Sequence, residues 1–249
     1  MPYQYRFELA HLNESEQEKW DKETKEISRL VARLKSTNDI PSGSLKVKIK
    51  KATVRRAKIA KKAHNKVAKV IEVIKEYFKE GQKWLLFVED GTHLQEIESE
   101  LQNLGYGPMR YEGNMLMDER DATIEFLTKN GGIIVSMKCL DEGVDIPSIS
   151  HSIIVSSSQN PRQFVQRRGR VLRKAGPEKN RAHIWDILVL PRIDSEDSSR
   201  SLILAELKRA HEFASFAENY TISNKLQSLL AQYDLDLEDI VEEEYDFEG

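Results

Sequence analysis

Residues 163–174, with the sequence QFVQRRGRVLRK, carry the side chains of this chain that are best suited to bind phosphate. Gln163, Gln166, Arg170 and Arg173 are spaced by three, four and three residues, so on a helix they form one stripe. A guanidinium offers a planar fork of donors and stabilises the negative charge that develops during phosphoryl transfer. Taken alone, the same helix could equally be a solvated basic face or a strip that grips nucleic-acid phosphates.

The helix itself is predicted from its flanks. Asn160 and Pro161 provide an N-cap and a first-turn proline. Other side chains point away from the polar stripe and can pack on a sheet: Phe164, Val165, Val171 and Leu172. Arg167 lies at the rim of the stripe and Arg168 off it, so we interpret both as solvated or structural.

The chain contains no G-x-x-x-x-G-K-[ST] phosphate loop, no G-x-G-x-x-G and no G-x-S-x-G. Glu89–Asp90 and Asp141–Glu142 resemble the acidic strand ends that hold Mg²⁺. Because Mg²⁺ needs substrate phosphates beside it, we do not favour either pair as a metal site. The six histidines are scattered without ligand spacing. We therefore expect this chain alone to bind no metal.

Composition indicates a soluble globular protein of one large or two small domains. The chain has 249 residues, of which 39% are hydrophobic and 32% charged. It shows no apolar run of membrane-spanning length and no leader peptide, so we expect a cytoplasmic protein, nucleoid-associated if prokaryotic. The single cysteine, Cys139, excludes an internal disulfide and is interpreted as a small buried hydrophobe.

The net charge of −3 hides a strong segregation of charge. Residues 46–71 contain eleven Lys and Arg and no acid, whereas residues 234–249 contain nine acids and no base. Such asymmetry suggests a polyanionic partner. The basic run could contact phosphates or form a solvated helical face. The acidic end is interpreted as a disordered solubiliser or an autoinhibitory polyanion.

The first third of the chain is predicted to be one strand followed by two helices. Residues 3–12 alternate in polarity and predict a strand. Asn13 and Glu16 form a capping box for a helix that reaches about Leu34 and buries Trp20. Residues 36–44 are rich in turn residues. One further helix is expected over residues 53–79, with an apolar face of Ile59, Ala63, Val67, Val70, Ile74 and Phe78.

From residue 84 the pattern alternates between strands and helices. Strands are expected at 84–89, 108–113, 132–136, 151–156 and 183–190, and helices at 92–104, 118–129, 199–218 and 223–233. In the helix at 118–129, Ile124, Phe126 and Leu127 are expected to point inward. This order favours an α/β fold with a doubly wound, mainly parallel sheet.

Three segments together resemble motifs IV, V and VI of the second RecA-like domain of superfamily-2 helicases and translocases. They are LLFVED at 85–90, VSMKCLDEGVDIP at 135–147 and QRRGRVLR at 166–173. The Q-x-x-G-R-x-x-R pattern is met by Gln166, Gly169, Arg170 and Arg173, and the G-x-D pattern by Gly143 and Asp145. Residues 9–20 also resemble the segment after the first RecA-like domain in the DEAD/DEAH-type, repair- and restriction-related branch.

The resemblance implies roles around ATP. Arg170 and Arg173 would act as arginine fingers on the γ-phosphate of ATP held by a first RecA-like domain, which this chain lacks. Asp145 would accept a hydrogen bond from the ribose, with Gly143, Gln166 and Gly169 completing the ATP-binding side. A turn carboxylate before Pro147 is the alternative for Asp145.

The resemblance also implies contacts with a nucleic-acid backbone. Met137 stands where the family often has a threonine, and Ser136 beside it would take over that contact. Gly113 falls where the family places a backbone amide on a phosphate, and Arg120 matches a basic residue that contacts the strand. A sheet-edge position and a solvated helix residue are the respective alternatives.

We therefore expect an interdomain linker at 1–65, a RecA-like helicase C-terminal domain at 66–191, a C-terminal helical extension at 192–233 and an acidic tail at 234–249. The expected function is the second motor domain of an ATP-dependent DNA helicase or translocase, inactive alone. ATP with Mg²⁺ would be held by the first domain, in cis or as a separate subunit, and the other partner would be DNA or RNA. The alternatives are half of an RNA helicase and a non-catalytic nucleic-acid-binding or scaffold module.

Overall fold

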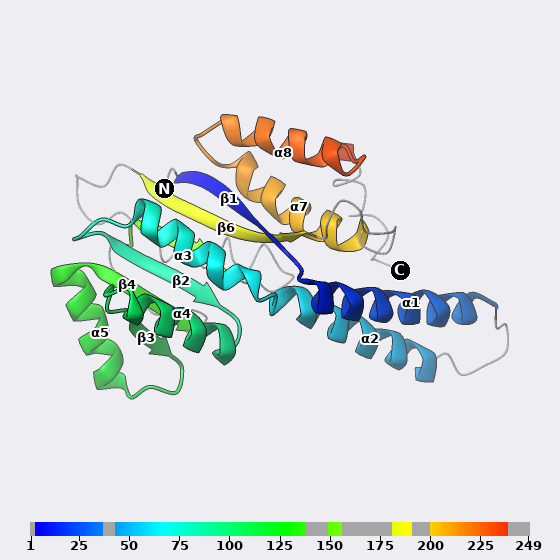
Figure 1. The fold of residues 1–249 in the computed structure, drawn as a ribbon, viewed down its shortest axis with the longest axis horizontal. Helices are drawn as coiled ribbons and strands as arrows, with labels where there is room; N and C mark the ends of the chain where they lie inside the picture. The colour runs from blue at the N-terminus through cyan, green and yellow to red at the C-terminus, as the bar shows by residue number, and fades with distance from the viewer. Residues whose placement is uncertain (1–2, 37–42, 138–148, 156–180, 191–199, 239–249) are drawn as a thin grey trace.

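The computed structural model describes residues 3–36, 43–137, 149–155, 181–190 and 200–238. One six-stranded sheet organises them, in the order β1-β6-β5-β2-β4-β3, and every strand pair is parallel. The strands are β1 (Tyr3–His11), β2 (Lys83–Val88), β3 (Met109–Glu112), β4 (Gly132–Met137), β5 (His151–Ile154) and β6 (Ala182–Leu190). The predicted α/β fold with a doubly wound parallel sheet is confirmed (Figure 1).

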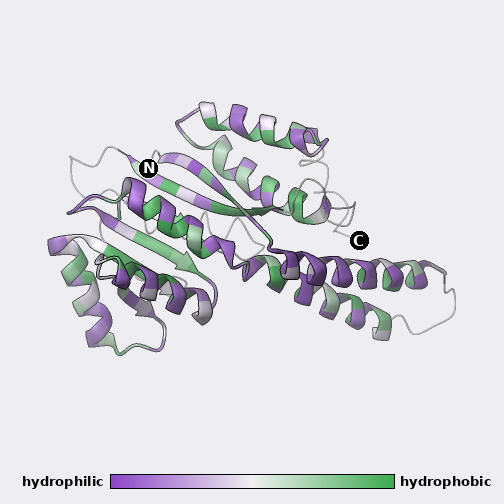
Figure 2. Cartoon of the chain, in the orientation of Figure 1, coloured by the Kyte–Doolittle hydropathy of each residue, from purple (hydrophilic) through white to green (hydrophobic). Residues whose placement is uncertain are grey.

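Helices cover both faces of the sheet and extend beyond it. They are α1 (Glu14–Ser36), α2 (Gly43–Lys61), α3 (Asn65–Tyr77), α4 (Gly91–Asn103), α5 (Met117–Asn130), α7 (Arg200–Ser215) and α8 (Thr221–Gln232). One apolar cluster joins one face of the sheet to α3 and α4, and a second joins the opposite face to α7 and α8. Figure 2 shows α1, which projects from the sheet, as predominantly hydrophilic.

The inner strands are apolar on both faces because helices cover both sides. Successive residues of β2 illustrate this: Trp84 and Leu86 belong to the cluster with α3 and α4, and Leu85 to the cluster with α7 and α8. All three are fully buried. The sheet is therefore covered on both faces, and its parallel pairing brings the carboxyl ends of all strands to one edge.

The predicted strand at 3–12 is confirmed as β1, but it is more than a connector. It pairs along its whole length with β6, from Tyr3 opposite Ala182 to His11 opposite Leu190. The strand expected to belong to a linker is therefore an edge strand of the main sheet. The domain boundaries proposed from the sequence stay a prediction.

A buried polar network ties β1 and β6 to α7. Arg209 of α7 donates from Nε and Nη2 to the two carboxylate oxygens of Asp186 at 3.0 Å each, and from Nη1 to Glu206 at 2.8 Å. The hydroxyl of Tyr5 donates to Asp186 at 3.0 Å. Glu206 in turn accepts the backbone N–H of Val189. Each charge is thus paired within the interior, as buried ions require.

The capping box predicted at the start of α1 is present. The backbone N–H of Glu16 donates to the Asn13 side chain, and the Glu16 carboxylate accepts the N–H of Asn13, both at 2.9 Å. Trp20 is buried as predicted, and the other members of its predicted apolar stripe, Ile27, Val31 and Leu34, are half-buried.

The single helix expected over 53–79 is wrong: the structure has two, α2 and α3, with a break at residues 62–64. The N–H of His64 donates to the Glu16 carboxylate at 2.9 Å, and the Asn65 amide donates to the carbonyl of His11 at 2.7 Å. These contacts turn the chain, so that α3 packs on the sheet and α2 packs along α1. The apolar pattern continues through the break and gives no sign of it.

One inward side chain of α5 was also predicted wrongly. Leu127 is fully buried and Ile124 half-buried, but Phe126 is 53% exposed. Helix α5 covers the sheet near its edge, where only a narrow stripe of its surface meets the strands. Among the described residues, no helix is long and apolar enough to cross a membrane.

Candidate nucleic-acid interface

All six parallel strands end at one edge of the sheet, and most described candidate residues lie there. The ends of β2, β3 and β4 carry Glu89–Asp90, Gly113 and Met137 respectively. Strand β4 lies between β3 and β2, with Met137 opposite both Glu112 and Val88. Ligands of open α/β sheets bind at this edge, at the point where the strand order reverses. Here α4 leads from β2 toward β3 on one side, while β5 and β6 lie on the other.

The structure brings together Gly113 and Arg120, two candidates seven residues apart. The Arg120 guanidinium donates from Nη2 to the carbonyl of Gly113. Its Nε makes no hydrogen bond within the described part of the chain. Glu119 holds the first turn of α5 by accepting the backbone N–H of Leu116 at 3.1 Å. A half-exposed guanidinium therefore stands beside an exposed glycine at the end of β3.

Ser136 and Met137 occupy different environments although they are neighbours. Ser136 is 1% exposed, and its hydroxyl has no hydrogen-bond partner among the described residues. Met137 is half-buried at the very end of β4. Met137 is therefore the more exposed of the two, and the contacts of both residues with a nucleic acid stay a prediction.

Glu89 and Asp90 both make contacts within the described part of the chain. Glu89 pairs with Lys61 at 2.8 Å, and Asp90 lies 3.6 Å from Lys62. Asp90 also caps α4 by accepting the N–H groups of Thr92 and His93. Burial raises the pKa of Asp90, but these N–H groups and the nearby cations outweigh it, so the pKa is lowered. Within the described ranges, no group of three or more His, Cys, Asp or Glu side chains could hold a metal ion.

The candidates for the ATP side lie outside the described residues: Gln166, Gly169, Arg170, Arg173, Gly143 and Asp145. So do Cys139 and the helix expected after Pro161. The described residues stop at Met137, which ends β4, and at Val155, one residue after the end of β5. Met137 and Val155 both lie at the same carboxyl edge of the sheet as Gly113.

Sequence reasoning missed a buried lysine near this edge. Lys66, in the first turn of α3, is 3% exposed. Burial lowers its pKa to about 8, and the negative charge of Glu206 partly opposes that effect. Lys66 lies within the basic run, so its sequence context predicted a solvated lysine. Its place next to Val67 and Val70, on a helix that packs on the sheet, was the available signal.

Comparison with known proteins agrees with this geometry. The family described as helicase conserved C-terminal domain matches residues 65–175. The SWI2/SNF2 ATPase core of Sulfolobus solfataricus, solved in complex with double-stranded DNA, superposes with a TM-score of 0.58 at 17% identity, over 96% of this chain and 50% of that one. Over residues 65–175 the chain is therefore similar to helicase C-terminal domains.

Two curated relatives are similar to part of this chain. A protein named as an ATP-dependent RNA helicase, MJ1505 of Methanocaldococcus jannaschii, is 28% identical over 122 residues, 45% of this chain and 16% of the relative. The DNA 3′-5′ translocase XPB2 of Sulfurisphaera tokodaii is 30% identical over 121 residues, 48% of this chain and 26% of the relative. The match therefore spans 16% of the length of one relative and 26% of the other. The helicase family uses ATP, so an ATP-dependent activity belongs to the family to which this domain is similar.

Proposed function

We propose that this chain is the second motor domain of an ATP-dependent DNA helicase or translocase. The observation that supports the proposal is the carboxyl edge of the sheet. There Gly113 follows β3, Met137 ends the neighbouring strand β4, and Arg120 of α5 donates to the carbonyl of Gly113. The chain departs from this same edge toward the segments that bear the remaining motifs. DNA is proposed because one relative is named a DNA translocase, and the superposed SWI2/SNF2 core was solved with duplex DNA.

In this proposal Arg170 and Arg173 face the γ-phosphate of ATP bound by a first RecA-like domain, while Gln166, Gly169, Gly143 and Asp145 line the nucleotide. A guanidinium at the transferring phosphoryl group is worth about 10³ to 10⁵ in rate. In this proposal the first domain would hold Mg²⁺ together with the phosphates of ATP.

At the nucleic-acid side, Arg120 and Gly113 would contact the sugar–phosphate backbone from the end of β3, and Met137 with Ser136 from the end of β4. Backbone contacts of this kind position a strand without reading its sequence. The nucleic-acid contacts and the ATP contacts of this domain would thereby lie at the same edge of its sheet.

The proposal is tested by reconstitution. The chain is mixed with the first RecA-like domain of the same motor, and ATP hydrolysis is measured with and without duplex DNA. We expect little hydrolysis by the chain alone and DNA-stimulated hydrolysis by the mixture. Arg170→Ala and Arg173→Ala should each abolish the stimulated rate, by about 10³-fold or more.

Arg168→Ala is the matched control, because Arg168 lies in the same stretch but off the stripe of Arg170 and Arg173. It should leave the rate within a few-fold of wild type. Full activity of the Arg170→Ala mixture would refute the assignment of the arginine fingers. Equal loss in all three variants would show that this helix acts by charge or folding and not by a positioned pair.

A further inference from the structure

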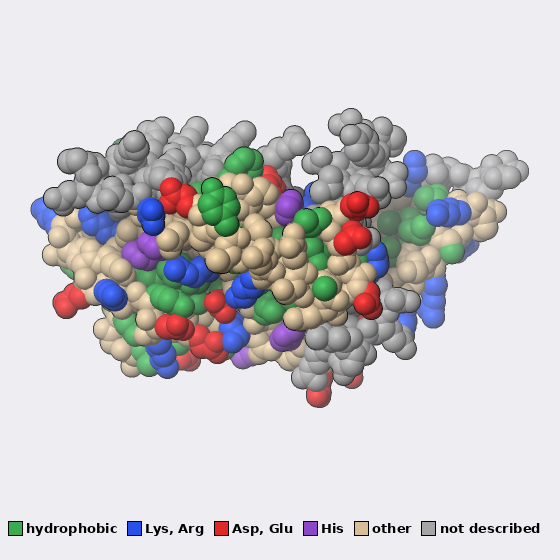
Figure 3. All heavy atoms as spheres, turned by 90° about the horizontal axis from the view of Figure 1, so that it is seen from above, with side chains coloured by type: hydrophobic (Ala, Val, Ile, Leu, Met, Phe, Trp, Pro, Cys, Tyr) green, Lys and Arg blue, Asp and Glu red, His purple; other side chains and the backbone are tan. Residues whose placement is uncertain are grey.

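The hairpin of α1 and α2 projects from the sheet, and its second helix has an unbalanced charge. Helix α2 carries eight basic residues and no acid. It packs along α1, and its buried residues are Leu45, Ala52 and Ala60. The space-filling view shows Lys and Arg side chains beside hydrophobic ones at the projecting end of the molecule (Figure 3). The face of α2 turned away from α1 is therefore a candidate interaction surface.

Two of the cations on α2 are already neutralised or engaged by α1. Arg55 donates to Glu23 and forms an ion pair with Glu26 at 3.0 Å. Arg56 lies over the ring of Trp20, with its guanidinium carbon 5.0 Å from the ring centroid. These side chains hold the hairpin together, so they are not available to a partner.

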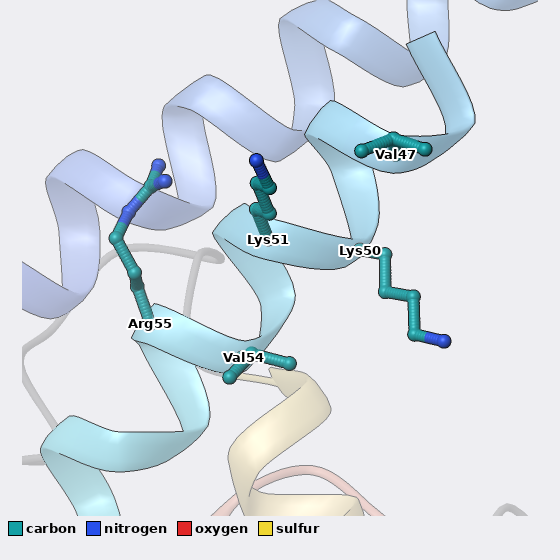
Figure 4. Close-up of a pocket in the computed structure, with 5 residues that line it drawn as sticks. All are labelled: Val47, Lys50, Lys51, Val54 and Arg55. Atoms are coloured by element: carbon teal, nitrogen blue, oxygen red, sulfur yellow. The ribbon is translucent and has the colours of Figure 1, made fainter. Parts of the chain in front are cut away.

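The remaining face forms what we call the α2 stripe: Val47, Lys50, Lys51, Val54 and Lys58. Their spacing of three, one, three and four residues places them on one side of the helix. All five are exposed. Within the described chain, Lys50, Lys51 and Lys58 have no ion pair, and the stripe contains no acid. An open hollow on the surface is lined by the first four of its members and by Arg55 (Figure 4).

The stripe leads directly to the edge of the sheet described above. A second hollow is lined by Val54, Lys58, Lys61 and Lys62 of this region together with Glu89 and Asp90. Lys61 contacts Glu89, which follows Val88, and Val88 is the register partner of Met137. A polymer that lies along the stripe therefore arrives at the carboxyl ends of β2 and β4.

The dimensions and charge fit a sugar–phosphate backbone. From Val47 to Lys58 the helix rises about 16 Å at 1.5 Å per residue. That length covers about five nucleotide steps of 3.4 Å along one strand of a duplex. Lysines on long flexible stems suit such a regular row of phosphates, because each acts as a point charge without a fixed fork geometry.

We propose that the α2 stripe binds the phosphate backbone of duplex DNA, as an arm that extends the contact surface of the helicase domain. The choice of DNA rests on the proposed function. The binding itself does not depend on ATP hydrolysis, so it is measured on this chain alone. Failure of reconstituted ATP hydrolysis and failure of the stripe are then separate results.

The test uses a fluorescently labelled 20-base-pair duplex, with binding followed by anisotropy between 50 and 200 mM KCl. The variant Lys50→Gln/Lys51→Gln/Lys58→Gln keeps good helix formers and removes three charges. Log K falls with log salt, and each lost phosphate contact makes that slope less steep by about 0.9. The three substitutions should therefore reduce the magnitude of the slope by about 2.7. Across this fourfold salt range, wild type should lose about 40-fold more affinity than the variant.

The matched control is Lys19→Gln/Lys22→Gln/Arg29→Gln on α1. These side chains are also exposed and unpaired among the described residues, and the change in net charge is the same. The control should keep the wild-type slope. A stripe variant with the wild-type slope overturns the proposal and leaves an acidic protein segment as the occupant of the stripe. A control that loses as much as the stripe variant also overturns it, because the effect would then follow bulk charge.

Discussion

Replacing Arg209 by methionine should destabilise the domain more than any single change at an exposed lysine. The wild-type guanidinium makes two bonds to Asp186 and two to Glu206, at 2.8 to 3.0 Å. Asp186 is fully buried and Arg209 is 8% exposed. Methionine fills much of the space but leaves both carboxylates without their cation. Breaking a buried pair in this way costs about 3 to 5 kcal/mol.

The loss is measured by urea unfolding at pH 7, monitored by tryptophan fluorescence. With a urea dependence of about 2 kcal/mol per molar, the midpoint should fall by roughly 2 M. Lys208→Met on the same helix is the control, because Lys208 is only half-buried and should change the free energy of unfolding by less than about 0.5 kcal/mol.

The pH dependence of the loss tests its electrostatic origin. Burial already raises the pKa of Asp186, and the charge of Arg209 partly offsets that rise. Without Arg209 the folded-state pKa rises further above the unfolded value, so the folded variant binds a proton that the unfolded chain releases. Stability is then gained as pH falls, and the deficit of Arg209→Met should be smaller at pH 5 than at pH 7. A deficit below about 1 kcal/mol, or one that grows toward pH 5, would refute this reasoning.

Three further outcomes follow from other buried or constrained residues. Burial lowers the pKa of Lys66 to about 8. Wild-type stability should therefore rise as pH increases from 8 toward 10.5, by on the order of 3 kcal/mol, and urea titrations of Lys66→Met should lack this rise. Gly131 has φ of +75°, and an added Cβ would lie 2.6 Å from the backbone of Gly81. Gly131→Ala should cost more than about 2 kcal/mol, whereas Gly105→Ala, with φ of +81° and open space, should cost about 1 kcal/mol by the same assay. Burial, with Arg6 and Arg181, lowers the pKa of His183, so stability is full above pH 6.5 and declines as pH falls below it. Thermal unfolding of His183→Gln should show a weaker decline between pH 7 and 5, and an identical profile would contradict this.

Local chemistry determined much of the fold in advance. Continuous apolar runs such as 84–89 and 183–190 indicate strands covered on both faces. A strand with one face in solvent would instead alternate apolar and polar residues. The capping box of Asn13 and Glu16 is equally readable, since its two hydrogen bonds join residues three apart. Helices 92–104 and 118–129 appear within two residues of their predicted bounds. The resemblance to helicase motifs is likewise a property of residue order alone.

Tertiary structure decided what depends on residues far apart in the chain. The sequence does not show that β1 pairs with β6, because nothing local connects Tyr5 to Asp186 across 181 positions. It does not show the break before α3, because that break is held by Glu16 of α1 and His11 of β1. It also cannot separate Lys66, buried against the sheet, from Lys50, Lys51 and Lys58 on the open face of α2. Periodicity shows which side of an element is apolar. Which element covers each side, and which side stays exposed, is decided only when the elements pack.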